Sequence, residues 1–155
     1  MKRMIAMCLM TMLMLSVALV VYGDPGNQST TVNFSVSGDS YVIDIPKSVS
    51  ANSGSLEVTV LECHTELPIY VSISSNNYNQ TYGWKMLKNG NSQNNPIYYQ
   101  ISVDGNNYIQ GDVFALTGNM SKTLNFSIVR DNFFKFAEEG SYYDTLTFAF
   151  SLGNY

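Results

Sequence analysis

Apolar and polar residues alternate along most of the chain beyond residue 30, which is the pattern of strands with one buried face. The β-branched and aromatic residues that strands prefer fill these runs. The apolar positions of the eight runs are Val32, Phe34 and Val36; Tyr41, Ile43 and Ile45; Leu56, Val58 and Val60; Leu67, Ile69, Val71 and Ile73; Tyr82, Trp84 and Met86; Ile97, Tyr99, Ile101 and Val103; Leu124, Phe126 and Ile128; and Leu146, Phe148, Phe150 and Leu152.

Turn residues separate the runs. Asn89-Gly90 and Asp104-Gly105 are pairs that tight hairpins require. Proline has no backbone donor for a strand ladder. We therefore expect Pro46, Pro68 and Pro96 at strand ends or edges. Residues 131–139 are the one candidate for helix, a single turn expected under the last hairpin, and residues 76–80 and 88–95 are expected as polar loop tips. Eight short strands with regular turns predict an all-β fold, an antiparallel β-sandwich over residues 24–155.

The N-terminal segment has a different pattern. Lys2 and Arg3 precede an uncharged run over residues 4–22, and Gly23 follows before Asp24-Pro25. This order predicts a signal peptide over residues 1–23. The alternative is a retained anchor, because a run of about 19 residues approaches the roughly 20 that span a bilayer. Both interpretations place the domain outside the cytoplasm, secreted or on the extracytoplasmic cell surface, with membrane contact only through residues 4–22 if they are uncleaved.

Composition changes this picture in three ways. Removing Lys2 and Arg3 takes the net charge of the chain from −4 to about −6, which disfavours nucleic acid as a partner. Cleavage also leaves Cys63 as the one cysteine, so the exported domain is expected to rely on its core rather than on a disulfide. A hydrophobic content of 45% argues against disorder, and the length allows a single domain.

Short motifs at both ends and in the middle of the exported part carry a family resemblance. Residues 140–148 read Gly-Ser-Tyr-Tyr-Asp-Thr-Leu-Thr-Phe, residues 41–46 read Tyr-Val-Ile-Asp-Ile-Pro, and residues 83–85 read Gly-Trp-Lys. They resemble segments of exported bacterial β-sandwiches, namely spore-coat-U-like and pilin-like surface proteins and small secreted proteins of Gram-positive gut bacteria. The resemblance implies an immunoglobulin-like sandwich on the cell surface or in an assembled fibre, and it supplies no catalytic residue.

The closing strand also has a physical interpretation. Tyr142 follows a glycine turn and shares a face with Leu146 and Phe148. We expect its ring to pack and its hydroxyl to bond to a nearby loop, as in a tyrosine corner.

Cys63-His64, flanked by Glu62 and Glu66, is the one cluster that suggests catalysis or metal binding. Neighbours on a strand point to opposite faces, so Cys63 and His64 are poorly placed to act together. The exported chain holds no second cysteine or histidine to complete a zinc site or a nucleophile–base pair. We therefore expect no catalytic, metal or cofactor site here, although oxidative dimerisation through an exposed Cys63 stays open.

The acidic residues are scattered. Glu138-Glu139 lie together at a turn, and nothing places an opposing acid across a cleft from them. Asp104-Gly105-Asn106-Asn107 lacks the spacing and final Glu of a calcium loop, which favours a hairpin turn. No phosphate loop, nucleophile elbow or dinucleotide motif is present, so we expect the protein not to be an enzyme.

Aromatic residues near loops keep a carbohydrate site open. They are Tyr78, Tyr82, Trp84, Tyr98 and Tyr108, and residues 76–80 form the best candidate stretch because asparagines flank Tyr78. Tyr82, Trp84 and Tyr99 share faces with aliphatic residues, so we expect these three in the core and leave Tyr78 undecided.

The sequence thus predicts a noncatalytic exported surface protein, structural or adhesive and pilin-like, with a secreted carbohydrate-binding module as the alternative. Expected partners are like subunits, other surface proteins or glycans. Residues 30–37 are a candidate donor strand for a neighbouring subunit, and pairing within their own domain is the competing interpretation.

Overall fold

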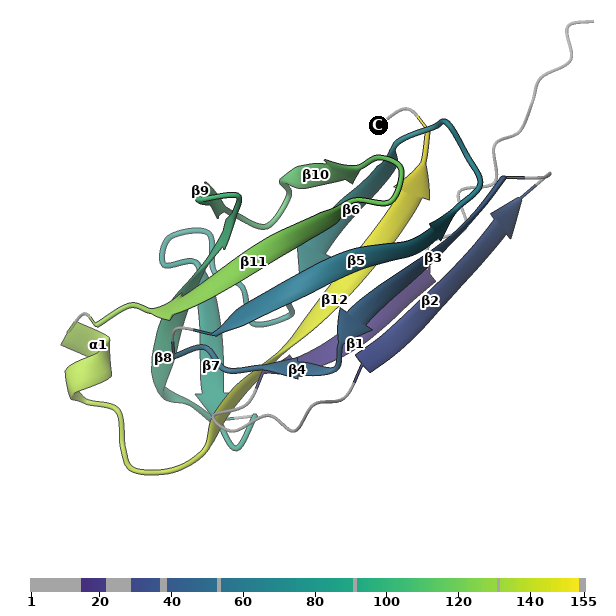
Figure 1. The fold of residues 1–155 in the computed structure, drawn as a ribbon. Helices are drawn as coiled ribbons and strands as arrows, with labels where there is room; N and C mark the ends of the chain where they lie inside the picture. The colour runs from purple at the N-terminus through teal and green to yellow at the C-terminus, as the bar shows by residue number, and fades with distance from the viewer. Residues whose placement is uncertain are drawn as a thin grey trace, which may run out of the picture.

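The computed structural model describes residues 15–21, 29–36, 39–52, 54–90, 92–130 and 132–153, and the side chains from residue 40 onward apart from residues 92–94, 132 and 133. The described residues form an all-β, sandwich-like fold (Figure 1). The elements are β1 (Leu15–Val21), β2 (Ser29–Val36), β3 (Asp39–Pro46), β4 (Ser48–Val49), β5 (Ser55–Cys63), β6 (Ile69–Ser74), β7 (Trp84–Lys88), β8 (Ser92–Val103), β9 (Asn106–Tyr108), β10 (Val113–Leu116), β11 (Ser121–Ile128), α1 (Asn132–Lys135) and β12 (Tyr142–Leu152).

The strands make two layers. One runs in the order β10-β6-β12-β1-β4, and the other in the order β7-β8-β11-β5-β3-β2 with β9 paired to β8. β12 connects the layers, because its first residues Tyr142 and Tyr143 pair with β7 whereas its later residues pair with β6 and β1. The ladders between these strands are antiparallel, except for a two-residue parallel contact of β1 with β4. The predicted antiparallel sandwich is therefore confirmed.

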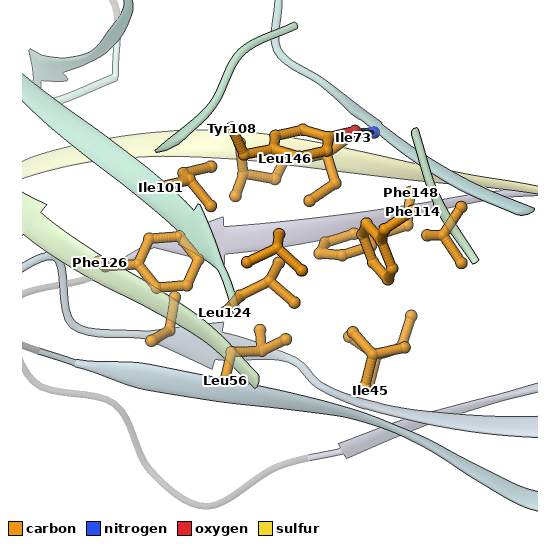
Figure 2. Close-up of a cluster of buried hydrophobic side chains, with 14 of the residues drawn as sticks. Ile45, Leu56, Ile73, Ile101, Tyr108, Phe114, Leu124, Phe126, Leu146 and Phe148 are labelled. Atoms are coloured by element: carbon orange, nitrogen blue, oxygen red, sulfur yellow. Dashed lines mark hydrogen bonds between the residues drawn. The ribbon is translucent and has the colours of Figure 1, made fainter. Parts of the chain in front are cut away.

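The core lies between the layers and is built by the alternating positions. Leu124 and Phe126 of β11 and Leu56 of β5 face Leu146 and Phe148 of β12 across the interior (Figure 2). All five side chains are 2% exposed or less. Burial of an aliphatic or aromatic side chain stabilises a fold by about 1.5–3 kcal/mol, so these facing positions dominate the stability of the sandwich.

Each of the eight predicted runs contains a strand, and three of the local predictions hold. Asn89, Gly90, Asp104 and Gly105 all have positive φ, as their turns require. Asp104-Gly105 turns β8 into β9, so the hairpin interpretation of this segment is confirmed. The single helical turn within residues 131–139 is also confirmed as α1, although it contacts β8 rather than the last hairpin.

The remaining local predictions have mixed outcomes. Pro96 lies inside β8 rather than at its end, but at an edge position as predicted, because β11 pairs with β8 only from Tyr99 onward. It lies next to the bulge against β7, where Asn95 takes a φ of 50°. A bulge leaves a residue without its ladder partner, which is why proline is tolerated there. Residues 92–95, expected as loop, belong to the same strand. Leu67 precedes β6 and is exposed rather than buried.

The N-terminal segment enters the fold through β1. Leu15–Val21 pairs with β12 in continuous antiparallel register, from Leu15 opposite Phe150 to Val21 opposite Asp144. Residues 1–14 and 22–28, including the predicted cleavage point and most of the expected lead, lie outside the described residues. Among the described residues, no helix is long and apolar enough to cross a membrane. Removal of residues 1–23 on export stays a prediction.

Candidate functional site

The Cys63-His64 cluster does not assemble into a site. Cys63 ends β5, is half-buried, and its thiol donates to the carbonyl of Thr65 at 3.5 Å. His64, Glu62 and Glu66 are exposed, and the backbone of His64 bonds to Ser40. Within the part of the chain that the structure describes, no three His, Cys, Asp or Glu residues group closely enough to hold a metal ion.

The acids of the two predicted turns are used in surface ion pairs. Glu138 accepts from the Lys88 ammonium at 2.7 Å, and the Lys122 ammonium pairs with Asp104 across neighbouring strands. Solvent screens exposed pairs of this kind, so they contribute little to stability. Their position indicates a structural role for both acids.

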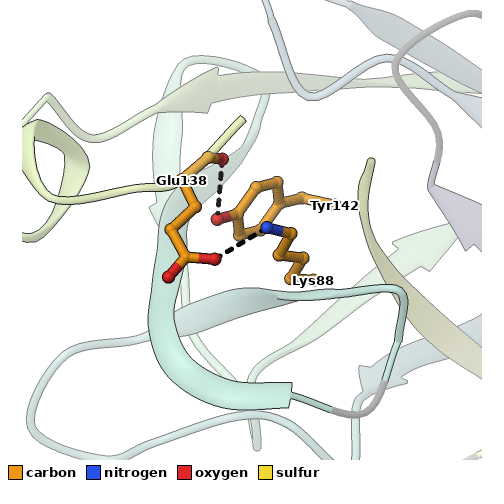
Figure 3. A network of polar contacts seen from close by, with 3 residues as sticks. All are labelled: Lys88, Glu138 and Tyr142. Atoms are coloured by element: carbon orange, nitrogen blue, oxygen red, sulfur yellow. Dashed lines mark hydrogen bonds and ion pairs between the residues drawn. The ribbon is translucent and has the colours of Figure 1, made fainter. Parts of the chain in front are cut away.

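The predicted tyrosine-corner contact of Tyr142 is present. The hydroxyl of Tyr142 donates to the carbonyl oxygen of Glu138 at 3.1 Å, which ties the start of β12 to the loop that follows α1. The same loop carries the Lys88–Glu138 pair, and Figure 3 shows all three side chains together.

A buried polar centre surrounds Asp144, which is 1% exposed. One carboxylate oxygen accepts from the Ser75 hydroxyl at 2.7 Å and the Asn77 amide at 2.8 Å, and the other accepts from the Tyr99 hydroxyl at 2.7 Å. The carboxylate also accepts from the backbone of Thr145. These donors come from β8, from β12 and from the loop after β6, so one side chain holds the two layers together.

Burial dominates the electrostatics of this centre. Desolvation raises the pKa of the Asp144 carboxyl, while the hydrogen bonds from Tyr99, Ser75 and Asn77 act in the opposite direction. Desolvation, followed by the charge of Asp144, raises the pKa of Tyr99 well above the usual value. The carboxylate and its donors are bonded to one another, and Asp144, Ser75 and Tyr99 are buried. We interpret the Asp144 centre as structural.

Most side chains of the candidate sugar-binding stretch, residues 76–80, make structural contacts within the domain. Tyr78 is half-buried and packs edge-on against Trp84, with ring centroids 4.8 Å apart. Asn77 belongs to the Asp144 centre, and the side chain of Asn79 accepts from the backbone of Thr81 and Tyr82. The stretch is therefore a structured loop whose tyrosine is only partly accessible.

Trp84 and Tyr99 are buried, as expected, but the prediction for Tyr82 is wrong. Tyr82 lies before β7 rather than within it and is 54% exposed, with its ring against Tyr98 at a centroid distance of 5.5 Å. Tyr108, near a loop in sequence, is 4% exposed and braces the core. Its hydroxyl donates to the Asp112 carbonyl at 2.5 Å and accepts from the Ile73 backbone at 2.9 Å.

Comparison with models of protein families, with curated proteins and with solved structures finds no match to this chain. The resemblance to exported pilin-like and spore-coat-U-like sandwiches stays a prediction. The functional argument therefore depends on the geometry of the molecule itself.

Two features of that geometry were missed by sequence reasoning. Asp144 shares the buried face of β12 with Leu146 and Phe148. Its place in this alternation could have predicted a buried polar centre, because an acid at a core position needs several donors. The pairing of residues 15–21 with β12 had no such signal, since these residues lie within the uncharged N-terminal run that predicts an export signal rather than a strand.

Proposed function

We propose that the protein is a noncatalytic, exported surface protein with a structural or adhesive role, which joins its neighbours by strand addition at β12. The observation that supports this proposal is the position of β1. Leu15–Val21 lies within the segment predicted to direct export, yet it pairs along β12 from Asp144 to Phe150. The fold of the full chain thus includes a strand that export is expected to remove.

Both predicted fates of residues 1–23 have the same consequence. Cleavage separates β1 from the domain, and a retained anchor places residues 4–22 in the lipid, so neither leaves β1 beside β12. The edge of β12 then carries unpaired backbone groups next to the core residues Leu146, Phe148 and Phe150. An exposed edge of this length is a ready template for a strand from another chain.

β2 is the alternative source of a strand, and its pairing argues against that role. Ser29–Val36, which covers most of the predicted donor segment, pairs with β3 of the same chain from Ser29 opposite Pro46 to Val36 opposite Asp39. Donating β2 would open the edge of β3. We therefore assign the acceptor to β12 and expect the added strand to come from a like subunit or another surface protein.

The exported product tests the proposal. Its mass gives the N-terminus, and size-exclusion at several concentrations gives its association state. We expect a chain that begins near residue 24, associates, and gains thermal stability when a peptide with the sequence of residues 15–21 is added, because the peptide restores the missing ladder. Bound peptide should also reduce association.

The matched control is the same peptide with both Ala18→Pro and Leu19→Pro, because hydrogen-bonded and non-hydrogen-bonded pairs alternate and one of these two residues therefore loses a donor to β12. It should stabilise the domain less than the parent peptide. A product that starts near residue 24, stays monomeric at all concentrations and ignores both peptides contradicts strand addition at β12.

A carbohydrate-binding module is the second candidate, and the exposure of Tyr82 favours it. A tyrosine ring that is 54% exposed and supported from behind by Tyr98 offers an apolar face on which a sugar ring can stack. A glycan array with the exported product tests this role, with Tyr82→Ala expected to lose binding. Phe136→Ala, which removes another exposed aromatic ring, is the control and should leave binding unchanged.

A further inference from the structure

A cavity of about 640 Å³ opens at the end of the sandwich where α1, the β4–β5 connection and the start of β12 meet. This volume is within the range of small-molecule sites, which is about 300–1,000 Å³. It lies outside both features used above, since neither the pairing edge of β12 nor Tyr82 contributes to its lining.

The lining divides into an apolar floor and a polar rim. The floor consists of Met86 of β7, Ile97 of β8, Ile128 of β11 and Phe134 of α1. Met86 and Ile97 are 4% and 9% exposed, so the floor is continuous with the core. The rim is polar, with Ser50, Asn52 and Ser141.

Arg130 is the one charged residue among the described lining residues. It is exposed and its guanidinium lies over the ring of Phe134, 5.6 Å from the centroid, at the boundary of floor and rim. Stacking on an aromatic ring orients the planar fork of donors with which arginine binds carboxylates.

Two described polar groups near the cavity, Tyr142 and Glu138, have other partners than this cation. The hydroxyl of Tyr142 donates to the Glu138 carbonyl, and the Glu138 carboxylate accepts from Lys88 (Figure 3). No carboxylate belongs to the described lining, so the cavity combines an apolar floor with positive charge.

We propose that this cavity binds a small amphiphilic carboxylate, with its apolar body on Met86, Ile97 and Phe134 and its carboxylate on Arg130. The floor offers no directional donor or acceptor to a sugar, and a single arginine is a poor match for the multiple charges of a nucleotide. A medium-chain carboxylate satisfies both parts of the lining.

Titration calorimetry with sodium decanoate tests the inference. The protein is the exported product of the full-length gene, and decanoate stays below its micelle concentration. We expect one decanoate per chain, weaker binding of butyrate, which lacks most of the apolar body, and weaker binding of decanol, which lacks the charge. Arg130→Gln should weaken decanoate binding by about tenfold, the size expected for one charge-assisted contact.

Two further variants make the result specific. Arg130→Lys keeps the charge but loses the stacked planar fork, so its affinity for decanoate should lie between those of the parent and Arg130→Gln. Lys122→Gln removes a cation at the opposite end of β11 and should leave affinity unchanged. The inference is overturned if decanoate does not bind, or if Arg130→Gln binds it as tightly as the parent. Association through β12 should be the same in all these variants, so a failure here is distinct from a failure of the proposed function.

Discussion

The two long edges of β12 differ in where their partners come from. On one edge β12 pairs with β6, from Thr147 opposite Ser74 to Leu152 opposite Ile69, and both strands belong to the part of the chain expected after export. On the other edge it pairs with β1, from the segment expected to leave. The β6 edge thus belongs to the permanent fold, whereas the β1 edge depends on which strand is available.

The β6 edge is also reinforced from its end. The loop that follows β6 supplies Ser75 and Asn77 to Asp144, and Tyr99 of β8 completes the centre from the other layer. The Asp144 centre therefore locks the β6 edge with side chains in addition to its backbone ladder.

The largest expected effect comes from removing the lock. Asp144→Ala should destabilise the exported product by about 3–5 kcal/mol, because it leaves the buried donors of Tyr99, Ser75 and Asn77 without an acceptor. Urea denaturation measures the loss. Asp144→Asn keeps the shape and one acceptor and should lose less; equal losses would show that the carboxylate charge, rather than the acceptors, holds this edge.

A smaller effect is expected from breaking the β6 ladder itself. Ser72 lies between Val113 of β10 and Ala149 of β12, so its backbone donor is used within the sheet whichever neighbour it faces. Ser72→Pro should therefore cost at least about 1–3 kcal/mol in the same assay, because a carbonyl of the neighbouring strand loses its donor. Ser72→Ala keeps the donor and should be nearly neutral. If proline is tolerated at this position, backbone pairing does not hold β6 in the sheet between β10 and β12.

The smallest effect on the free energy of unfolding is expected from a rise in pH by one unit. Alkaline pH acts on the centre around Asp144 through Tyr99, without a mutation. Burial raises the pKa of Tyr41 to about 12 and that of Tyr99 well above its usual value, while tyrosine in the unfolded chain ionises near 10.0. Between pH 10 and 12 the unfolded chain therefore loses protons that the folded chain keeps, and stability falls as pH rises. The slope is up to about 1.4 kcal/mol per pH unit for each tyrosine.

Denaturation curves recorded from pH 8 to 11.5 measure this slope. Tyr41→Phe removes one of the two groups and should make the slope shallower without changing its sign. A stability that is constant above pH 10 would mean that Tyr99 is accessible in the folded state, and hence that the centre around Asp144 is open.

The alternating strands were predictable because each has one face in the core and one in water. β4 and β9 were not, since two or three residues are too few to show a period, and β10 reads Val-Phe-Ala-Leu without a polar alternate. The exposure of Tyr82 escaped prediction for another reason. Its parity matches Trp84, but Gly83 takes a φ of 88° and breaks the strand between them, so the two side chains no longer share a face.

The position of Trp84 has a practical consequence. The chain has one tryptophan and eleven tyrosines. The indole is 2% exposed, donates to the Tyr108 carbonyl at 3.0 Å, and lies within 6.4 Å of the rings of Tyr78, Tyr99 and Tyr108. Light absorbed by these tyrosines will be emitted largely by a single shielded indole, so one fluorescence band reports on the whole sandwich. Its red shift on unfolding gives every stability measurement described above an intrinsic optical signal that needs no label.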